Sequence, residues 1–558
     1  MTCGEALITL LERRGVELVF GIPGVHTLEL YRGLARSGIR HVTPRHEQGA
    51  AFAADGYARV SGRPGVCILI TGPGVTNAAT AVASAYHDSQ PLMVISSATA
   101  TPDSGRGRGA LHDLPDQRAF MSTITAFSET VESPEQLPGA LERAFAVLEG
   151  PRPRPVHIGI PTDVLAMAAG EAAGDAETQT APANGRGQTM PEPDAAELER
   201  AVRLLADARE PVILLGGGAI DAGAQALALS ALCGAPIATS VNGKGAVPET
   251  HPAALGSGLT LEPIFGELER ADVVVAAGTE LSEVDYYYQE RLPRFSGALI
   301  RIDTDAGQLH AGRAATVALH GDAAQTLGRL AELLQGARAR DGRSDAAGGD
   351  GAERAASGGF DRGDVAAQRA ERLRAGLRWW PGAESLLAVL DALSEALPSD
   401  TIVAADSTQL AYAANIHLPV QMPRSYLAPA GYGTLGPAVP MAIGAKLAAP
   451  DRPVACLVGD GGLLFTVAEL ATAAQLGLGI AVVVWNNHGY GEIRDSMDRA
   501  GIPHIGTSAS APDLGALARG LGCHAARVDA LEGIGGAIAN ALGADRPTLI
   551  ELPAELAG

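Results

Sequence analysis

Two polar residues that close two apolar runs are the clearest chemical feature of this sequence. Asp460 closes the run Val454–Val458, and Asn487 closes the run Ile480–Trp485. The stretch between them, from about Leu463 to Leu478, has the length and composition of one helix, so we expect a βαβ unit with parallel neighbouring strands. Both polar residues would then lie side by side at the carboxyl ends of the strands, where ligands bind in open α/β sheets.

The same pair has the donor chemistry of a magnesium–diphosphate site. A carboxylate and an amide oxygen are hard donors. Mg²⁺ takes a few such protein oxygens and completes its shell with water and phosphate. The sequence therefore predicts that Asp460 and Asn487 bind a metal ion and, through it, a diphosphate group.

Charge and cysteine usage narrow the functional classes. The 558 residues include 42 Lys and Arg and 63 Asp and Glu, which gives a net charge of −21. This acidic excess argues against binding to nucleic acid or to an anionic membrane. Five cysteines without a CxxC pair indicate free thiols in a reducing compartment. No signal peptide or membrane-length apolar stretch is evident, so we expect a soluble, cytoplasmic protein.

Two segments with linker composition divide the chain. Residues 166–194 are rich in Ala, Gly, Glu, Thr and Pro, and residues 336–368 combine glycines with mixed charges. They leave pieces of about 1–165, 195–335 and 381–558, each of which alternates between strand and helix patterns. The expected fold class is α/β, with three domains and mainly parallel sheets.

Glycine turns follow several of the expected strands. In the first piece, a buried strand ends in Thr71–Asn77, and a helix of small residues begins near Glu47. In the middle piece, strands end in Gly216–Gly218 and at Gly278. Such turns are typical of nucleotide-binding sites, but a tight turn that packs a helix on a sheet is an equal alternative.

Taken in order, these motifs resemble those of the thiamine diphosphate-dependent 2-oxo acid decarboxylase and acetolactate synthase family. The resemblance covers nearly the whole chain except the two linkers. It implies an N-terminal pyrimidine-binding domain, a central Rossmann-like domain and a C-terminal diphosphate-binding domain. The motifs that carry it are GIPG, RHEQGAAFAADGYAR, TGPGVTN, PVHIGIPTDV, GYGTLGPAVPMAIGA and GDG followed by NN.

The resemblance assigns roles to the first candidate residues. Glu47 matches the glutamate that hydrogen-bonds N1′ of the cofactor's aminopyrimidine and favours the imino form, which removes the C2 proton of the thiazolium. A glutamate on a helix surface is the alternative. Asp460 and Asn487 match the Mg²⁺ ligands, with the Gly489 carbonyl as the third.

Further residues are expected to contact the cofactor by the same resemblance. Leu435 matches a bulky apolar residue that lies under the cofactor and forces its two rings into a V; packing in the core is the alternative. Gly461 and Gly462 would let the backbone approach the diphosphate, which the following helix N-terminus would favour. The remaining expected contacts are Thr71, Asn77, Ser407, Thr408 and Gly433.

The resemblance also implies an assembly and a reaction. In this family Glu47 and Asp460 would act on one cofactor from different subunits, so a homodimer or homotetramer is expected. The substrate is a small-molecule 2-oxo acid, and the cofactor accepts the electrons released as CO₂ leaves. The product is then an aldehyde, after protonation, or a carboligation product, after addition to a second carbonyl compound.

Two segments differ from those of acetolactate synthases. Leu111–Gln117 replaces a usual Phe-Gln pair, and Gly278–Tyr288 has acidic and aromatic residues in place of a basic segment that contacts FAD. The sequence therefore argues against FAD binding, although the Gly216–Gly218 turn remains. The residues after Asn487 also differ from the usual continuation in the synthases.

Five segments instead resemble those of the 5-guanidino-2-oxopentanoate (2-ketoarginine) decarboxylase branch: GIPGVHTLELYRGL, ALHDLPDQ, GTELSEVDY, ADSTQ and NNHGYGEIR. A guanidinium tail needs carboxylates for bidentate pairing. His26 and His112 are candidate proton carriers, and a structural role is the alternative for each. The candidate carboxylates, any of which could instead be a solvated surface acid, are Asp113, Asp116, Glu283, Asp285 and Glu492.

Three functional hypotheses follow. The first is a lyase that forms 4-guanidinobutanal and CO₂ from 5-guanidino-2-oxopentanoate. The second is an acetolactate synthase-like carboligase that acts on pyruvate. The third is a cofactor-binding paralogue with a regulatory or structural role, against which the intact Glu47, Asp460 and Asn487 argue.

Overall fold

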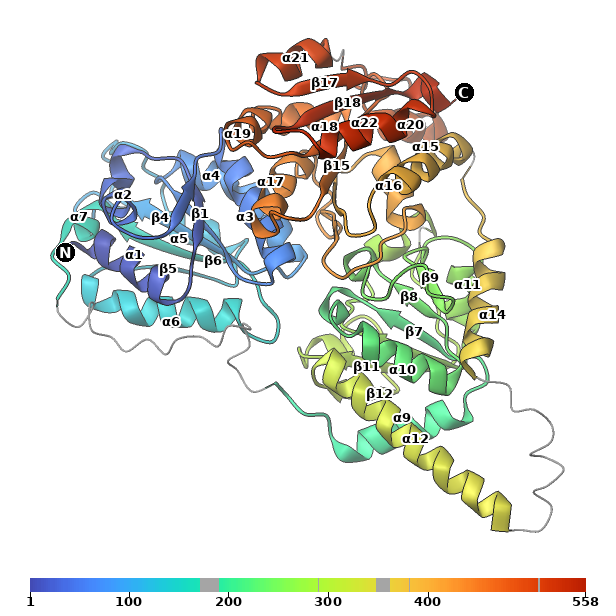
Figure 1. Cartoon of the computed structure of the whole chain (residues 1–558). Coiled ribbons are helices and arrows are strands. Elements are labelled where there is room, and N and C mark those ends of the chain that lie inside the picture. The colour runs from blue at the N-terminus through green and yellow to red at the C-terminus, as the bar shows by residue number, and fades with distance from the viewer. Residues whose placement is uncertain (171–189, 290, 348–361, 381, 510–511, 558) are drawn as a thin grey trace. The chain divides into compact units, whose positions relative to one another are not determined.

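The computed structural model describes residues 1–170, 190–289, 291–347, 362–380, 382–509 and 512–557. In this part of the chain it contains three six-stranded sheets, whose strands pair mainly in parallel (Figure 1). The predicted α/β fold with mainly parallel sheets is confirmed. Contacts divide the chain into two compact units. One comprises Met1–Thr189, Glu395–Ala411 and Leu427–Gly558, and the other comprises Met190–Ser394 and Tyr412–Tyr426.

The first sheet has the strand order β2-β1-β3-β4-β6-β5. Its strands are β1 (Leu18–Gly21), β2 (Arg40–Val42), β3 (Gly65–Leu69), β4 (Leu92–Ala98), β5 (Phe127–Thr130) and β6 (Val156–Pro161). The helices of this part are α1 (Cys3–Arg13), α2 (Leu28–Leu34), α3 (Glu47–Ser61), α4 (Pro73–His87), α5 (Gln117–Ser122), α6 (Leu137–Leu148) and α7 (Thr162–Ala166). Strand β3 is buried along its whole length, as its continuous apolar run predicts for a central parallel strand.

The third sheet has the order β14-β13-β15-β16-β18-β17. Its strands are β13 (Ile402–Ala405), β14 (Tyr426–Leu427), β15 (Val454–Gly459), β16 (Ala481–Asn486), β17 (His524–Arg527) and β18 (Thr548–Pro553). Strands β15 and β16 are parallel neighbours with Gly459 opposite Trp485, as predicted from their apolar runs. The helices of this part are α17 (Ala438–Ala448), α18 (Asp460–Thr466), α19 (Glu469–Gln475), α20 (Gly491–Ala500), α21 (Leu514–Gly520) and α22 (Gly533–Leu542), whereas α15 (Ala383–Ala396) and α16 (Gln409–His417) fall mostly within the ranges of the other unit.

The connection between β15 and β16 differs from the single helix expected from about 463 to 478. It consists of two short helices, α18 and α19, and the first begins at Asp460 itself. The Thr466 hydroxyl at the end of α18 donates to the Gly436 carbonyl at 2.6 Å, and the Glu469 side chain at the start of α19 accepts from Arg45. The two helices are therefore held by different partners, which periodicity alone does not show.

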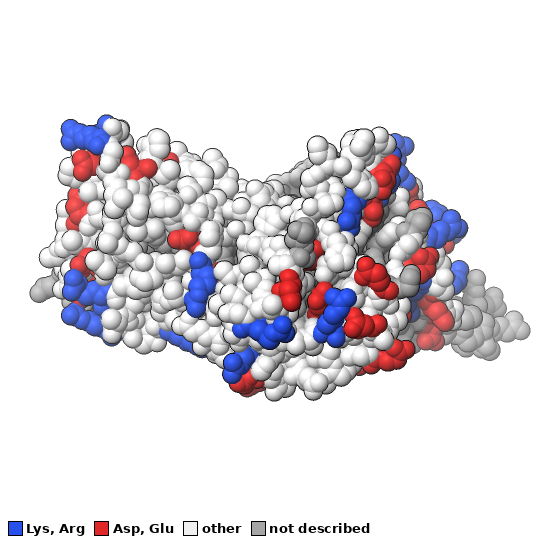
Figure 2. Space-filling view, turned by 90° about the horizontal axis from the view of Figure 1, so that it is seen from above, with Lys and Arg blue, Asp and Glu red and all other residues white. Residues whose placement is uncertain are grey.

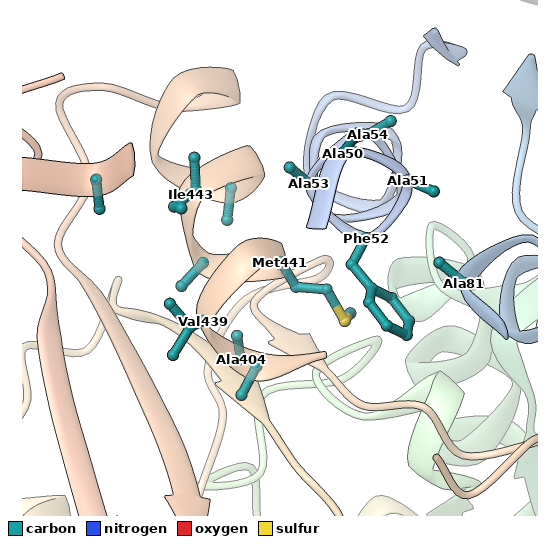
Figure 3. Packing of buried hydrophobic residues seen from close by; sticks show 14 of the residues in the cluster. Ala50, Ala51, Phe52, Ala53, Ala54, Ala81, Ala404, Val439, Met441 and Ile443 are labelled. Atoms are coloured by element: carbon teal, nitrogen blue, oxygen red, sulfur yellow. The ribbon is translucent and has the colours of Figure 1, made fainter. Parts of the chain in front are cut away.

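One hydrophobic core joins the first and third sheets. It includes residues from α3 and α17, together with Cys67 of β3 and Cys456 of β15. Figure 3 shows the close-up, with Phe52 of α3 beside Met441 of α17. A Cβ added to Gly56 would lie 2.2 Å from the Met441 carbonyl oxygen. The small residues of α3 therefore serve a close helix–helix contact.

The second unit contains the sheet of order β12-β11-β10-β7-β8-β9. Its strands are β7 (Val212–Leu215), β8 (Ile237–Thr239), β9 (Ala254–Gly256), β10 (Val273–Ala277), β11 (Ala298–Asp303) and β12 (Val317–His320). Its helices are α9 (Ala195–Asp207), α10 (Gly223–Cys233), α11 (Ile264–Arg270), α12 (Ala323–Ala347) and α14 (Arg362–Ala375). Regular structure thus extends into both ends of the expected 336–368 linker. The rest of that linker, and residues 171–189 of the other, lie outside the described residues.

The surface and the cysteines agree with the composition. All five cysteines are buried free thiols, as predicted. Among the described residues in view, acidic and basic side chains are intermixed without a continuous basic surface (Figure 2). No helix in the described part of the chain is both long and apolar enough to cross a membrane.

Candidate functional site

Three oxygen atoms converge where β15 and β16 end. Asp460 is only 1% exposed and is the first residue of α18. The Asn487 Oδ1 atom lies 2.8 Å from the Gly489 carbonyl oxygen and 3.3 Å from Asp460 Oδ1. In an octahedral Mg²⁺ shell with bonds of about 2.1 Å, neighbouring oxygens lie about 3 Å apart. The oxygen atoms of Asp460, Asn487 and Gly489 are therefore spaced as the predicted Mg²⁺ site requires.

The Asn487 amide has two possible orientations, which differ in what they bind. In the orientation described, its Nδ2 donates to Gln409 Oε1 at 3.1 Å and its oxygen faces the other two oxygens. After rotation, its nitrogen would donate to the Gly489 carbonyl and to Asp460 Oδ1. The rotated amide suits a metal-free site, whereas a cation between the three oxygens favours the first orientation.

The candidate metal site is not a cluster of acidic residues and histidines. No group of three or more His, Cys, Asp or Glu residues in the described part of the chain could hold a metal ion. The candidate site combines one carboxylate, one amide and one backbone carbonyl instead. Burial raises the pKa of the Asp460 carboxyl, and the N–H group of Gly489, which donates to it at 2.8 Å, opposes that effect. A nearby cation would favour the ionised form.

The glycines beside Asp460 are required by protein packing. A Cβ at Gly461 would lie 2.8 Å from the Tyr490 ring, and one at Gly462 would lie 2.8 Å from Asp406 Oδ1. Gly489 has φ +134°, and a Cβ there would lie 2.3 Å from the Thr507 carbonyl oxygen. These contacts explain the residue type without a ligand, and backbone approach to a diphosphate stays a prediction.

Asp406 is a residue of this site that the sequence reasoning did not single out. It follows β13, is 3% exposed, and accepts from the backbone N–H groups of Ser407 at 2.8 Å and Gly436 at 3.0 Å. Burial raises the pKa of its carboxyl to about 6, against the effect of these N–H groups. Its position directly after a buried strand, as for Asp460, was the available signal.

The Asp406 carboxylate fixes the loop that carries Leu435. The Ser407 hydroxyl adds a bond to the Thr434 carbonyl at 2.9 Å. Leu435 is partly exposed and is not a member of the buried core, which argues against the core-packing alternative. Of the other predicted contacts near it, Thr408 is buried against Gly459, and Gly433 has φ +64° with open space at its Cβ position.

Glu47 begins α3, and the structure brings it together with Asn77. The Asn77 Nδ2 group donates to Glu47 Oε2 at 2.9 Å. The His46 side chain accepts from the Gln48 N–H at 3.1 Å and caps the helix directly before Glu47. Two predicted cofactor contacts therefore meet at the N-terminal end of α3.

His26 and His112 form a pair beside Thr71. Their ring centroids are 5.1 Å apart with edge-to-face geometry, and His26 Nδ1 lies 3.3 Å from Thr71 Oγ1. Burial, and secondarily the charge of His112, lower the pKa of His26. His112 has φ +63°, and its buried Nδ1 atom has no hydrogen-bond partner in the described part of the chain.

Gln117, at the start of α5, holds the glycine turn against the His112 loop. The Gly72 N–H donates to its Oε1 at 2.9 Å, and its Nε2 donates to the Ser97 carbonyl at 2.9 Å. Gly72 has φ +66°, and a Cβ there would lie 2.2 Å from the His112 carbonyl oxygen. Within the segment Leu111–Gln117, no sequence pattern marked Gln117 for this role.

The candidate carboxylates for substrate binding have different partners. Asp113 accepts from the Thr99 hydroxyl at 2.9 Å, and Asp116 caps α5 through the Ala119 N–H at 2.8 Å. Glu492 lies 3.3 Å from Arg499, and burial raises the pKa of its carboxyl. The remaining two, Glu283 and Asp285, belong to the other unit.

The glycine turns of the second unit pack on one another. The Gly216 N–H donates to the Ala277 carbonyl at 2.9 Å, and the Gly218 N–H donates to the Gly278 carbonyl at 3.0 Å. A Cβ at Gly216 would lie 2.2 Å from the Gly278 carbonyl oxygen. These N–H groups are used within the protein, which supports the tight-turn alternative. The absence of FAD stays a prediction.

Comparison with protein families agrees with this geometry. Residues 1–120 match the family model described as "Thiamine pyrophosphate enzyme, N-terminal TPP binding domain", residues 198–330 match its central domain, and residues 406–552 match its C-terminal TPP binding domain. These matches include Glu47 in the first range, and Asp460 and Asn487 in the third.

Curated relatives cover the whole chain. A protein of Pseudomonas aeruginosa named "Probable 2-ketoarginine decarboxylase AruI" is 47% identical over 99% of this chain and 94% of its own length. A "Probable acetolactate synthase large subunit" of Methanococcus aeolicus is 30% identical over 99% of this chain and 92% of its length. The "Acetolactate synthase large subunit" of Corynebacterium glutamicum is 33% identical over 99% and 86%. The chain therefore belongs to the thiamine pyrophosphate enzymes, and thiamine diphosphate is its cofactor.

Proposed function

We propose that this protein is a Mg²⁺- and thiamine diphosphate-dependent carboxy-lyase that converts 5-guanidino-2-oxopentanoate into 4-guanidinobutanal and CO₂. The observation that carries the substrate is the 47% identity to the Pseudomonas aeruginosa protein named for 2-ketoarginine, against 30% and 33% for two acetolactate synthases. The match extends over 99% of the chain and therefore includes both candidate site regions.

Different residues of the chain would bind different parts of the cofactor. Asp460, Asn487 and the Gly489 carbonyl would hold Mg²⁺, which neutralises a diphosphate in a chain of net charge −21. Glu47 would hydrogen-bond the aminopyrimidine, and Leu435 would support the cofactor from below. When bound, thiamine diphosphate supplies the electron sink for the loss of CO₂.

His26 and His112 would deliver the proton that completes the aldehyde. Because the pKa of His26 is lowered, its neutral ring dominates near pH 7 and would first take up a proton from solvent; the protonated ring would then be a stronger proton donor than an ordinary histidine. The unpartnered Nδ1 atom of His112 is a second position for that proton. Delivery of a proton by these residues would favour the aldehyde product over addition to a second carbonyl compound.

Glu492 is the carboxylate that best suits the guanidinium tail. Asp113 already accepts a hydrogen bond from the Thr99 hydroxyl, and Asp116 already caps the N-terminus of α5. The Glu492–Arg499 pair is long at 3.3 Å, and the Arg499 side chain is 67% exposed, so a substrate guanidinium could replace it. A bidentate pair would then form between two fixed planar groups.

The acetolactate synthase-like reaction is the second candidate, and the relatives named for it support it. Product analysis separates the two. Purified protein with Mg²⁺ and thiamine diphosphate should release CO₂ and 4-guanidinobutanal from 5-guanidino-2-oxopentanoate. Acetolactate formed from pyruvate as the faster product would reject the proposal.

The same proposal includes a homodimer or homotetramer with active sites between subunits. It rests on the family resemblance, in which Glu47 and Asp460 of different chains meet at one cofactor. Sedimentation of the purified protein should give at least twice the mass of one 56.9 kDa chain. A monomer that is fully active would contradict this assembly.

A further inference from the structure

A buried carboxylate of the metal-binding region reaches into the segment that carries Glu47. Glu469 begins α19, nine positions after Asp460, and is 1% exposed. Its Oε1 atom accepts from the backbone N–H groups of Arg45 at 2.9 Å and His46 at 3.0 Å. These are the two residues directly before Glu47.

The other contacts of Glu469 hold its carboxylate in one orientation. The Thr472 hydroxyl donates to Oε2 at 2.6 Å, which leaves Oε1 for the two backbone N–H groups. At the far end of α19, Gln475 Oε1 accepts from Arg45 Nη2 at 2.6 Å. The same short helix therefore holds the residue before the α3 cap through both backbone and side chain.

The Glu469 carboxylate packs directly against Gly49 of α3. A Cβ added to Gly49 would lie 2.3 Å from Glu469 Oε1 and 2.5 Å from its Cδ. Glycine inside a helix makes the helix less stable than alanine would. Glycine is needed at position 49 because any larger residue would displace the Glu469 carboxylate from the Arg45 and His46 N–H groups.

We propose that Glu469 is a positioning residue, which sets the direction of the Glu47 side chain by fixing the backbone at Arg45 and His46. This inference rests on the proposed role of Glu47. The hydrogen bond from Glu47 to the aminopyrimidine depends on its angle and distance, and a displacement of about 1 Å can lower a catalysed rate by about a hundredfold. Glu469 itself touches no reacting atom.

Two readouts separate positioning from general stability. The first, in cofactor-free protein, is hydrogen–deuterium exchange at the Arg45 and His46 amides, which reports the bonds to Glu469 directly. The second is the exchange rate of the C2 proton of bound thiamine diphosphate, which reports Glu47 without any 2-oxo acid. Affinity for thiamine diphosphate is measured beside both.

The variants are Glu469→Ala, Glu469→Gln and Gly49→Ala, with Glu532→Ala as the matched control because Glu532 is exposed before α22. Glu469→Ala should lose amide protection and slow C2 exchange by at least about tenfold, with cofactor affinity changed less than about threefold. Glu469→Gln keeps an acceptor oxygen and should retain most of both. Gly49→Ala should reproduce the Glu469→Ala result, and the double variant should be no slower.

The outcomes also distinguish the inference from the proposed function. If Glu47→Gln slows C2 exchange but Glu469→Ala does not, Glu469 has no positioning role. Equal losses of C2 exchange and cofactor affinity in Glu469→Ala would show a purely structural residue and overturn the inference. Normal C2 exchange in Glu47→Gln would overturn the role of Glu47, and the inference with it.

Discussion

The buried Asp406 carboxyl should make the protein less stable as the pH rises from 4 to 7. Its pKa rises from 3.8 to about 6 because the folded chain removes it from water. The unfolded chain retains the ordinary value. Well below pH 3.8 the group is protonated in both states and has no effect on stability. Above about pH 6 it is ionised in both, and the folded state carries the full cost.

The magnitude follows from the shift. A rise of about two pKa units at 1.36 kcal/mol each lowers the free energy of unfolding by about 3 kcal/mol in all, of which about 2.5 kcal/mol develops between pH 4 and pH 7. Asp406→Asn removes the titration and keeps one acceptor oxygen for the Gly436 N–H. The difference in unfolding free energy between wild type and variant should therefore shift by about 2.5 kcal/mol in favour of the variant between pH 4 and pH 7.

The assay is urea denaturation of the cofactor-free protein, followed by circular dichroism at several pH values. Only the difference between the two proteins is interpreted, because other carboxyls titrate in both. Glu532→Gln, an exposed carboxylate, serves as the control and should show no such shift. A difference that is constant from pH 4 to pH 7, or that changes in favour of the wild type, would refute the reasoning.

Four further predictions concern the site. Glu47→Gln should lower kcat by about 10²–10³, seen in steady-state CO₂ release, since removal of one hydrogen bond made in the transition state has effects of this size; an unchanged kcat would contradict its role. Asp460→Ala should abolish the Mg²⁺-dependent binding of thiamine diphosphate in calorimetry, and binding of wild-type affinity would reject this metal site. Glu492→Gln should raise KM for 5-guanidino-2-oxopentanoate by about 10- to 100-fold, the loss of a charge-assisted pair, and leave turnover of 2-oxohexanoate unchanged; equal effects on both substrates would exclude Glu492 from tail binding. The purified protein should show no flavin absorbance, and stoichiometric flavin would contradict the account of Gly216–Gly218.

The sequence was sufficient to predict the part of the site that depends only on which strands are neighbours. Apolar runs identified β15 and β16, and the rule that parallel strands end at one edge placed Asp460 beside Asn487. The family resemblance predicted that Glu47 and Asn77 each contact the cofactor, but it did not predict the hydrogen bond between their side chains.

The sequence was insufficient where a side chain crosses between distant segments. Glu469 binds the backbone of Arg45 and His46, more than four hundred positions away, and no local pattern marks such a bond. Gly49 and Gly56 looked like ordinary small residues of a helix, and only the packing shows that one makes room for a carboxylate and the other for the Met441 carbonyl.

The central claim is the choice of a 2-oxo acid with a cationic tail, and the ratio of two specificity constants tests it most directly. kcat/KM for CO₂ release is measured with 5-guanidino-2-oxopentanoate and with pyruvate, in the same preparation with Mg²⁺ and thiamine diphosphate. If Glu492 pairs with the substrate guanidinium, kcat/KM should be at least about tenfold higher for the guanidino substrate than for pyruvate. Equal values, or a preference for pyruvate, would contradict the account.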